Sequence, residues 1–301
     1  MWFWFSIAAL VFWSGSDLFS KIGCSSGDRY SHLKMVTAVG MVMGLHAAYE
    51  IFIGGVEISL QILFSYLPVS MLYILSMAVG YLGLRYIELS ISSPICNSSG
   101  AIVALLSMAV YGLSEVPRAA LAAVALVCIG VVALGIAEAT EDEELRSIRQ
   151  SESGKHYAKS ALAILIPIIY CLLDALGTFA DSIVLETLNE DSANTAYELT
   201  FFAAGLLCLF YTLVIKKQKP EFRAELPKYI GAVFETAGQF FYIYALAEPS
   251  RVVFSAPIIS SYCAASVLWS RIFLKEKLSV KHYASIILVV AGIVILGILD
   301  I

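Results

Sequence analysis

The chain has 301 residues, of which 59% are hydrophobic and 14% are charged, and its mean hydropathy is +0.83. A soluble domain carries roughly 25% charged residues, so this composition excludes an ordinary soluble protein. With a net charge of -5, nothing in the composition suggests nucleic-acid binding, which requires a basic face. The apolar residues form blocks of about 20, the length at which a helix crosses about 30 Å of hydrocarbon.

Ten such blocks follow one another, and each must be helical because lipid offers the backbone no hydrogen-bond partners. They cover residues 2–20, 33–53, 63–84, 93–112, 119–137, 159–180, 195–215, 227–246, 252–272 and 280–299. We therefore predict an all-α membrane protein with ten transmembrane helices. We expect a first five-helix repeat over 1–138, a polar linker over 139–158 and a second five-helix repeat over 159–301.

Basic residues are distributed unevenly between the predicted loops. Of the 19 Lys and Arg residues, all except Arg118 and Arg251 lie in or beside odd-numbered loops. These are Lys21, Arg29, Lys34, Arg85, Arg146, Arg149, Lys155, Lys159, Lys216, Lys217, Lys219, Arg223, Lys228, Arg271, Lys275, Lys277 and Lys281. Since cytoplasmic loops carry the excess of basic residues, the odd loops should be cytoplasmic and both termini external.

The two halves also match each other in sequence, in the same order and at nearly constant offset. The matches pair Trp13-Ser-Gly-Ser-Asp17 with Tyr170-Cys-Leu-Leu-Asp174, Pro94-Ile-Cys-Asn-Ser-Ser with Pro257-Ile-Ile-Ser-Ser, Ser114-Glu115 with Lys275-Glu276, and Gly130-Val-Val-Ala-Leu-Gly135 with Gly292-Ile-Val-Ile-Leu-Gly297. Because each half has an odd number of spans, we expect the second copy to be inverted. Inverted repeats build two exchangeable gates around a midplane site in many transporters.

Together these segments resemble the drug/metabolite transporter superfamily, in particular its EamA-like ten-span members. The resemblance is carried by Trp13-Ser-Gly-Ser, Tyr244-Ala-Leu-Ala, Pro257, Leu274-Lys-Glu-Lys-Leu-Ser279 and Ala291-Gly-Ile-Val-Ile-Leu-Gly297. The first half departs from it at Leu113-Ser-Glu-Val-Pro117. The resemblance implies a basket of ten helices around a central cavity. The first four spans of each half would line this cavity, and spans five and ten would pack at the periphery.

Ionisable side chains inside predicted spans are the first candidates for function, because each costs about 2.5–3.5 kcal/mol to insert. Asp17 and Asp174 occupy matching positions on opposite sides of the midplane, where alternating gates would need them. Glu235 lies near the centre of its span, where desolvation disfavours charge, which suits a proton carrier or a partner for a cationic substrate. Gln239 lies one turn further along the same face. The alternative is that these groups only brace neighbouring helices.

Aromatic and small polar residues near these positions are further candidates. The aromatic residues are Trp13, Tyr170, Tyr242, Tyr244, Tyr262 and Trp269, which could surround an amine through cation–π contacts or could simply pack. The proline and serine runs beginning at Pro94 and Pro257 predict helix breaks that either line a cavity or only help packing. We expect Asn97 to face a cavity, because lipid would not tolerate its amide.

Other polar residues suggest less specialised roles. His46 and Glu50 are too few for a metal site, and we expect no metal or cofactor. Glu198 is interpreted as solvated, and Asp181, Glu186, Glu190 and Asp191 as an ordinary acidic external loop. Gly40-x-x-x-Gly44 is interpreted as helix packing within one chain.

These observations predict a secondary transporter for a small polar metabolite, with cationic or amine-bearing substrates favoured, working by alternating access and open to proton coupling. The alternatives are a non-transporting membrane scaffold or sensor and an intramembrane enzyme, for which no recognised motif is present. We expect no enzyme activity, and a monomer or a homodimer in the lipid bilayer, with a small molecule as partner. The resemblance implies a bacterial cytoplasmic membrane.

Overall fold

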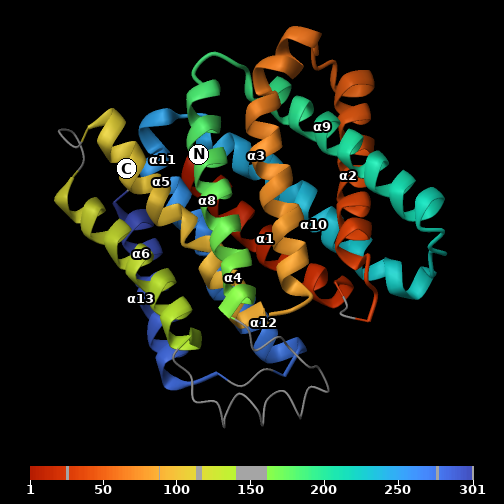
Figure 1. The fold of residues 1–301 in the computed structure, drawn as a ribbon. Helices are drawn as coiled ribbons and strands as arrows, with labels where there is room; N and C mark the ends of the chain where they lie inside the picture. The colour runs from red at the N-terminus through yellow and green to blue at the C-terminus, as the bar shows by residue number, and fades with distance from the viewer. Residues whose placement is uncertain (25–26, 88, 113–116, 140–160, 276–277, 300–301) are drawn as a thin grey trace.

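A computed structural model of the chain describes residues 1–24, 27–87, 89–112, 117–139, 161–275 and 278–299, and these ranges contain helices but no strand (Figure 1). The all-helical class predicted from the sequence is confirmed. Almost all of the predicted linker lies outside the described residues. So do Arg146, Arg149, Lys155, Lys159, Lys277 and the matched segments at Ser114-Glu115 and Glu276.

Five predicted spans of the first half appear as helices. The first three are α1 (Trp2–Gly23), α2 (Ser31–Tyr49, continued by the π-helix η1, Glu50–Gly54) and α3 (Leu60–Leu84). The fourth is divided into α4 (Leu89–Asn97) and α5 (Ser99–Tyr111), and the fifth is α6 (Arg118–Ala139).

The second half repeats this order. Its first three helices are α8 (Ala161–Val184), α9 (Glu190–Phe210, continued by the π-helix η2, Tyr211–Ile215) and α10 (Phe222–Leu246). After the short η3 (Pro249–Arg251), the fourth span is again divided, into α11 (Val252–Ser260) and α12 (Tyr262–Phe273). The last helix is α13 (Val280–Ile298).

Nine helical segments of the described chain are long and apolar enough to cross a membrane. The predicted span that is missing from these nine is α10, although it is a helix of 25 residues. Glu235, Gln239 and its tyrosines lower its hydropathy, so the polar residues that mark α10 as a candidate site also weaken its membrane signal. The chain is a multi-pass membrane protein, and the tenth span stays a prediction.

The helices of one half pack against those of the other in a reciprocal pattern. The first helix of each half packs against the third helix of the other half, as α1 with α10 and α8 with α3. The second helices pack together (α2 with α9), as do parts of the fourth spans (α5 with α11) and the fifth helices (α6 with α13). Exchanging the halves leaves these pairs unchanged, as expected of two related repeats. Their inverted orientation stays a prediction.

Glycines allow the closest of these helix crossings. A Cβ atom on Gly40 would lie 2.8 Å from the Gly205 Cα, which places α2 directly against α9. Gly44 faces the Phe202 ring, so the glycine pair of α2 does pack within the chain, as predicted. Gly130 and Gly292 occupy equivalent sites, since a Cβ on either would approach a backbone carbonyl of the opposite helix at 2.9 and 2.7 Å. Small residues permit such backbone contacts between membrane helices.

The fourth span of each half is interrupted where its proline and serine run predicts a break. The interruption lies at Ser98 between α4 and α5, and at Ser261 between α11 and α12. At each break the serine amide donates to the carbonyl of the proline four residues earlier, Pro94 or Pro257, at 3.1 Å. The predicted breaks are confirmed in both halves.

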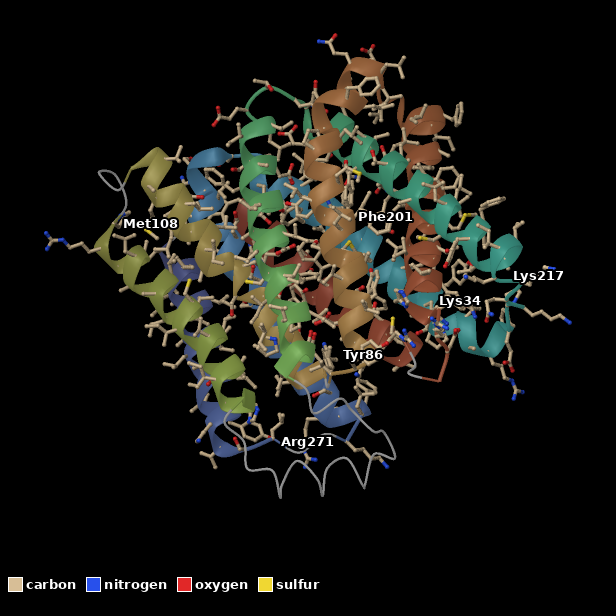
Figure 2. All side chains as sticks on the ribbon, viewed as in Figure 1. Lys34, Tyr86, Met108, Phe201, Lys217 and Arg271 are labelled. Carbon is tan, nitrogen blue, oxygen red and sulfur yellow. The ribbon has the colours of Figure 1, made fainter. Side chains whose placement is uncertain are left out.

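Charge separates the two ends of the bundle. We call the end holding Lys21, Lys34, Arg85 and Lys228 the basic end, and the end holding Met1 and the last turn of α13 the terminal end. The labels for Lys34, Tyr86 and Arg271 in Figure 2 lie toward the basic end, whereas both chain ends lie at the opposite end in Figure 1.

Two lysines of the basic end are buried within helices. Lys21 is 3% exposed and its Nζ donates to the carbonyls of Leu84 and Ile87 at 2.7 and 2.5 Å. Lys228 is 1% exposed and lies 3.2 Å from a carboxylate oxygen of Glu225. The distribution of basic residues assigned both lysines to loops one and seven, whereas the structure places them inside helices, since α1 extends to Gly23 and α10 begins at Phe222.

Candidate functional site

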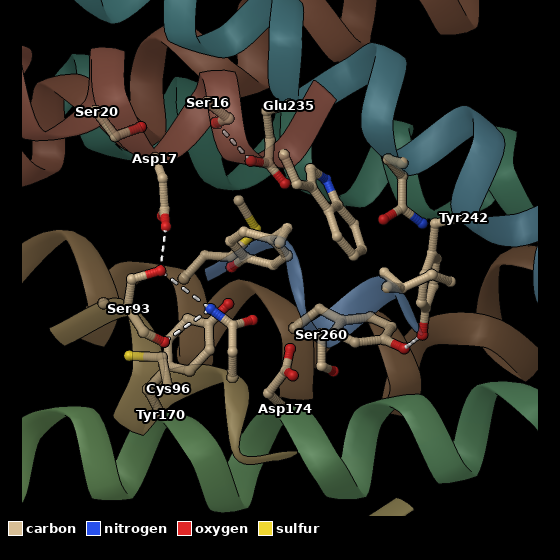
Figure 3. A pocket seen from close by; sticks show the side chains of 18 of the residues that line it. Ser16, Asp17, Ser20, Ser93, Cys96, Tyr170, Asp174, Glu235, Tyr242 and Ser260 are labelled. Carbon is tan, nitrogen blue, oxygen red and sulfur yellow. Dashed lines mark hydrogen bonds between the residues drawn. The ribbon is translucent and has the colours of Figure 1, made fainter. Parts of the chain in front are cut away.

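A cavity with an empty volume of about 890 Å³ lies between the two halves of the chain (Figure 3). Most of its wall comes from α1, α3, α4, α8 and α10, and α9, α11 and α12 complete it. Helices α6 and α13 contribute no lining residue, as the peripheral position of the fifth and tenth spans requires. Helix α2 also contributes none and packs against α9 and α10 instead, so the expectation that it lines the cavity is wrong.

All nine residues singled out for binding line this one cavity. They are Asp17, Asp174, Glu235, Gln239, Trp13, Tyr170, Asn97, Tyr242 and Tyr262. They come from five helices far apart in the sequence, and the fold brings them to a common space. Their part in binding stays a prediction. Trp269 and Tyr244 do not line the cavity; they bond to Ser14 and Asp191 instead.

Each carboxyl group of the cavity is held by serines of a neighbouring helix. Asp17 on α1 accepts hydrogen bonds from Ser93 of α4 and, at 2.8 Å, from Ser266 of α12. The other two carboxyl groups each accept one such bond. Asp174 on α8 accepts from Ser99 of α5 and Glu235 on α10 from Ser16 of α1, both at 2.7 Å. The bonds fix the orientation of the three groups and leave carboxylate oxygens for a ligand.

Asn97 supports this arrangement from the end of α4. Its amide donates to the backbone carbonyl of Ser93 at 2.8 Å and to the Ser93 hydroxyl oxygen at 3.2 Å. Ser93 in turn donates to Asp17. Asn97 therefore holds Ser93 in place beside Asp17 while also lining the cavity, and the break at Ser98 leaves room for this local bonding.

Several hydroxyl and amide groups face the cavity without a hydrogen-bond partner among the described residues. They are the Ser20 hydroxyl, the Tyr81 hydroxyl and the Gln239 amide nitrogen. Buried polar groups almost always find partners in folded proteins. A polar ligand bound in the cavity would supply hydrogen-bond partners for these groups.

Aromatic rings form much of the remaining wall, and two of them are placed alike in the two halves. Trp13 on α1 lies over Gly238 of α10, and Tyr170 on α8 lies over Gly80 of α3. In both cases a glycine on the third helix of one half leaves space for a ring of the first helix of the other half. Trp13 also packs against the Tyr242 ring at a centroid distance of 4.9 Å. Tyr73, Tyr81 and Tyr197 add rings that the sequence did not single out.

The charged residues that line the cavity are all acidic. Asp17, Asp174 and Glu235 contribute carboxyl groups, and no Lys, Arg or His is among the described lining residues. The cavity wall would therefore attract a cation and repel an anion.

At the basic end, outside the cavity, burial raises the pKa of the Cys24 thiol to about 12, although Lys228 and Lys21 oppose the shift.

Two further acids lie where the sequence predicted water. Asp181 belongs to α8, is 0% exposed and accepts a hydrogen bond from Tyr66 at 2.7 Å. Glu198 is also 0% exposed, and it bonds to Asn194 and His46. The expectations of a loop position for Asp181 and a solvated position for Glu198 are both wrong. Each acid was expected at or beyond the end of a predicted span, but α8 continues to Val184 and α9 begins at Glu190, so both lie inside helices.

The His46 and Glu198 contact forms a polar seam between α2 and α9, outside the cavity. His46 Nδ1 lies 2.9 Å from Glu198 Oε1, and His46 Nε2 lies 3.6 Å from Glu50. Among the described residues no group of three or more His, Cys, Asp and Glu side chains could hold a metal ion. The three residues therefore act as a bonded group that ties two helices together.

Comparison with known proteins agrees with this architecture. Residues 161–298 match the profile of the EamA-like transporter family. A solved crystal structure of a protein superimposes with a TM-score of 0.63 and 15% identity, covering 98% of this chain and 96% of the other. At that identity the likeness concerns the fold alone. No match was found among curated proteins.

Proposed function

Because residues 161–298 match the model of the EamA-like transporter family, we propose that the chain is a secondary transporter for a small organic cation. Members of this family are membrane transporters. The proposal concerns what the family does not specify: the substrate class, the coupling and the way in which the cavity is opened.

The observation that carries the proposal is the composition of the cavity wall. Three carboxyl groups from three helices line it, and its described part contains no basic side chain. Seven aromatic side chains line the same space, at Trp13, Tyr73, Tyr81, Tyr170, Tyr197, Tyr242 and Tyr262. Rings beside carboxylates favour amines and quaternary ammonium groups through cation–π and charge interactions. An anionic substrate would meet like charge in a space of low dielectric.

Alternating access is supported by the pairing of the helices. The cavity lies between two halves whose packing pattern is unchanged when the halves are exchanged. With α10 as the tenth span, a rocking movement of one half against the other would expose the same wall residues to either side. The two broken helices lie beside the cavity, where irregular backbone is tolerated in a membrane.

Proton coupling through Glu235 is part of the proposal. Glu235 lies in the cavity wall on α10 and accepts a hydrogen bond from Ser16. A carboxyl group that must choose between a proton and a substrate cation links the two fluxes. In this scheme Asp17 and Asp174, each held by serines, provide the constant negative field on the two sides of the cavity.

We also propose that the basic end faces the cytoplasm and that both termini are external, in a bacterial cytoplasmic membrane. The excess of Lys and Arg at one end of the bundle supports this orientation. It places Lys21, Lys34 and Arg85 inside and Met1 outside.

The test uses choline and its neutral carbon isostere 3,3-dimethyl-1-butanol, each loaded separately into proteoliposomes. The two molecules have nearly the same shape and differ in charge. We expect saturable efflux of choline or of another amine in a matched amine panel, faster under an inward proton gradient, and no protein-dependent efflux of the neutral isosteres. Equal flux of charged and neutral partners would overturn selection by charge.

The coupling is tested by Glu235→Gln, with Glu221→Gln as the matched control at the exposed start of the same helix. Glu235→Gln should remove the acceleration by the proton gradient, and Glu221→Gln should leave it unchanged. Retained acceleration in a folded Glu235→Gln protein would assign the coupling to another residue.

A further inference from the structure

A chain of buried hydroxyl groups lies just beyond the cavity, toward the terminal end. Along α8, Tyr170, Asp174, Thr178 and Asp181 follow at spacings of four, four and three residues, so they share one face of the helix. The first three line the cavity and Asp181 does not. Asp181 therefore lies about one turn outside the cavity, in the direction of the chain ends.

The same arrangement is found on α3, which packs against α8. Tyr73 lines the cavity, whereas Tyr66, seven residues earlier on the same face, does not. Tyr66 is 0% exposed and its hydroxyl donates to Asp181 Oδ1 at 2.7 Å. The Tyr73 hydroxyl lies 3.4 Å from Asp181 Oδ2. One carboxyl group thus accepts from two tyrosines of α3.

The chain of hydroxyl groups continues to a third helix. The hydroxyl of Tyr73 also bonds to that of Tyr242 on α10 and lies 3.3 Å from the Thr178 hydroxyl. A tyrosine hydroxyl has one proton to donate. When Tyr73 donates to Asp181, its oxygen can accept from Tyr242, which gives a directed series from Tyr242 through Tyr73 to Asp181.

These bonds connect the two halves of the chain. Tyr66 and Tyr73 belong to the first half, and Thr178, Asp181 and Tyr242 belong to the second. If one half moves against the other, the bonds must break. All five residues are at most 7% exposed, so this group is buried from solvent.

Among the described residues, no layer of tyrosines around a carboxyl group lies at the opposite end of the cavity. There the lining extends to Ser20 in the last turn of α1 and to Leu84, the last residue of α3. Lys21 lies beside this end, and the two described hydrogen bonds of its Nζ go to the backbone carbonyls of Leu84 and Ile87, in the same half of the chain. Along α1 and α3 the lining therefore extends to the last turn at the basic end, whereas Tyr66 and Asp181 at the terminal end lie outside it.

We propose that Asp181, Tyr66, Tyr73 and Tyr242 form the gate that closes the cavity toward the terminal end, with Asp181 as its central acceptor. The inference rests on the proposed transport function and adds the residues that control access to the same cavity. Opening of this gate separates α3 from α8 and α10, and the sealing bonds are exchanged for bonds to water.

The test measures access to the cavity and needs no substrate. Cys96 lines the cavity, and the other described cysteines, Cys24, Cys128, Cys171, Cys208 and Cys263, can be replaced by serine or alanine to leave it as the only thiol. A membrane-impermeant methanethiosulfonate reagent is then applied from the terminal end and, separately, from the basic end. Intact cells and inverted vesicles expose the two sides, and a tag on Met1 identifies which is which.

Tyr66→Phe keeps the ring and removes one bond to Asp181, and Asp181→Asn removes the charge. A hydrogen bond to a charged group lost from the closed state should raise labelling of Cys96 from the terminal end by about tenfold. Labelling from the basic end should fall or stay the same. Tyr86→Phe, an exposed tyrosine just past the end of α3, is the matched control and should have no effect.

Unchanged labelling from the terminal end in both variants would overturn the gate, provided that gel filtration shows the parent elution profile. Equal increases from both ends would also overturn it, because they indicate a loosened protein. If the gate variants respond as expected while choline and the amine panel are not transported, the gate stands and the proposed substrate class is wrong.

Discussion

The two halves of the chain share their helix crossings, but their polar contacts at the two ends of the cavity differ. Asp17 and Asp174 are equivalent and lie 157 residues apart, and the same offset relates Lys21 to Thr178 and Cys24 to Asp181. In the second half these positions bond to tyrosines of α3 and join the two halves. In the first half Lys21 bonds to the backbone at the end of α3, within its own half.

This difference distinguishes the helix packing, which the two halves share, from the polar contacts, which differ between them. The glycine crossings between equivalent helices, α2 with α9 and α6 with α13, are symmetric with respect to the two halves. The polar bonds at the ends of the cavity are not repeated, so they describe one position, in which the terminal end is closed. A repeat that is regular in backbone packing and irregular in its polar contacts is suited to exchange between two arrangements.

The largest effect on stability is expected from adding a side chain at the glycines where two helices cross. A Cβ on Gly130 would lie 2.9 Å from both the Ser285 carbonyl oxygen and the Val289 amide nitrogen, which cannot move aside as a side chain can. Gly130→Ala should lower the free energy of unfolding by about 1–3 kcal/mol, and Gly292→Ala should do the same. Thermal unfolding in detergent measures both.

Gly135→Ala is the control on the same helix, because its nearest neighbour would be Ile95 at an ordinary 3.7 Å. Its melting temperature should equal that of the parent or exceed it slightly, since alanine favours a helix. A drop in stability at position 135 as large as at 130 would remove the argument from close backbone contact.

A smaller effect is expected from the serines that hold the two equivalent aspartates. Asp17 accepts from two of them, and Asp174 has a described bond from Ser99 alone. Ser99→Ala should raise the KM for the transported cation by about tenfold, because it leaves Asp174 without its donor. Ser266→Ala should change KM less, since Ser93 still donates to Asp17. Equal changes would contradict the different support of the two acids.

Much of the fold follows from the sequence because the bilayer allows few solutions. Blocks of about 20 apolar residues must be helices, and the prolines at 94 and 257 locate both breaks to within a few residues. Helix α10 shows the limit of the hydropathy signal. Its polar residues reduce its hydropathy below that of the other spans while they also identify it as part of the cavity.

The sequence predicts those cavity residues whose insertion into a membrane is energetically costly, and it does not predict the others. Asp17, Asp174 and Glu235 stand out because a charge in a span is rare. Tyr66, Tyr73 and Tyr197 do not, since tyrosine is common in packing, at membrane interfaces and in cavities. Asp181 was missed because the predicted span ended at residue 180, whereas α8 continues to Val184.

The smallest effect tests the basic end, which has surface charge pairs in place of a gate. Hydrogen bonds from Lys34 and from the Tyr30 amide outweigh burial and lower the pKa of Asp28, which lies between α1 and α2. A lowered folded pKa stabilises the protein above the unfolded pKa of about 3.9, and this contribution is lost as pH falls through the folded value. Because Asp28 is partly exposed to solvent, Asp28→Asn should cost about 0.2–1 kcal/mol at pH 7.

The difference in melting temperature between Asp28→Asn and the parent should therefore shrink as the pH falls from 7 toward 3, and it should also shrink in high salt. Tyr66→Phe at the terminal end removes a bond buried from solvent, so its effect on melting should not depend on salt. A salt-sensitive Tyr66→Phe difference, or a salt-insensitive one for Asp28→Asn, would mean that the two ends are not closed by the different kinds of contact seen in the structure.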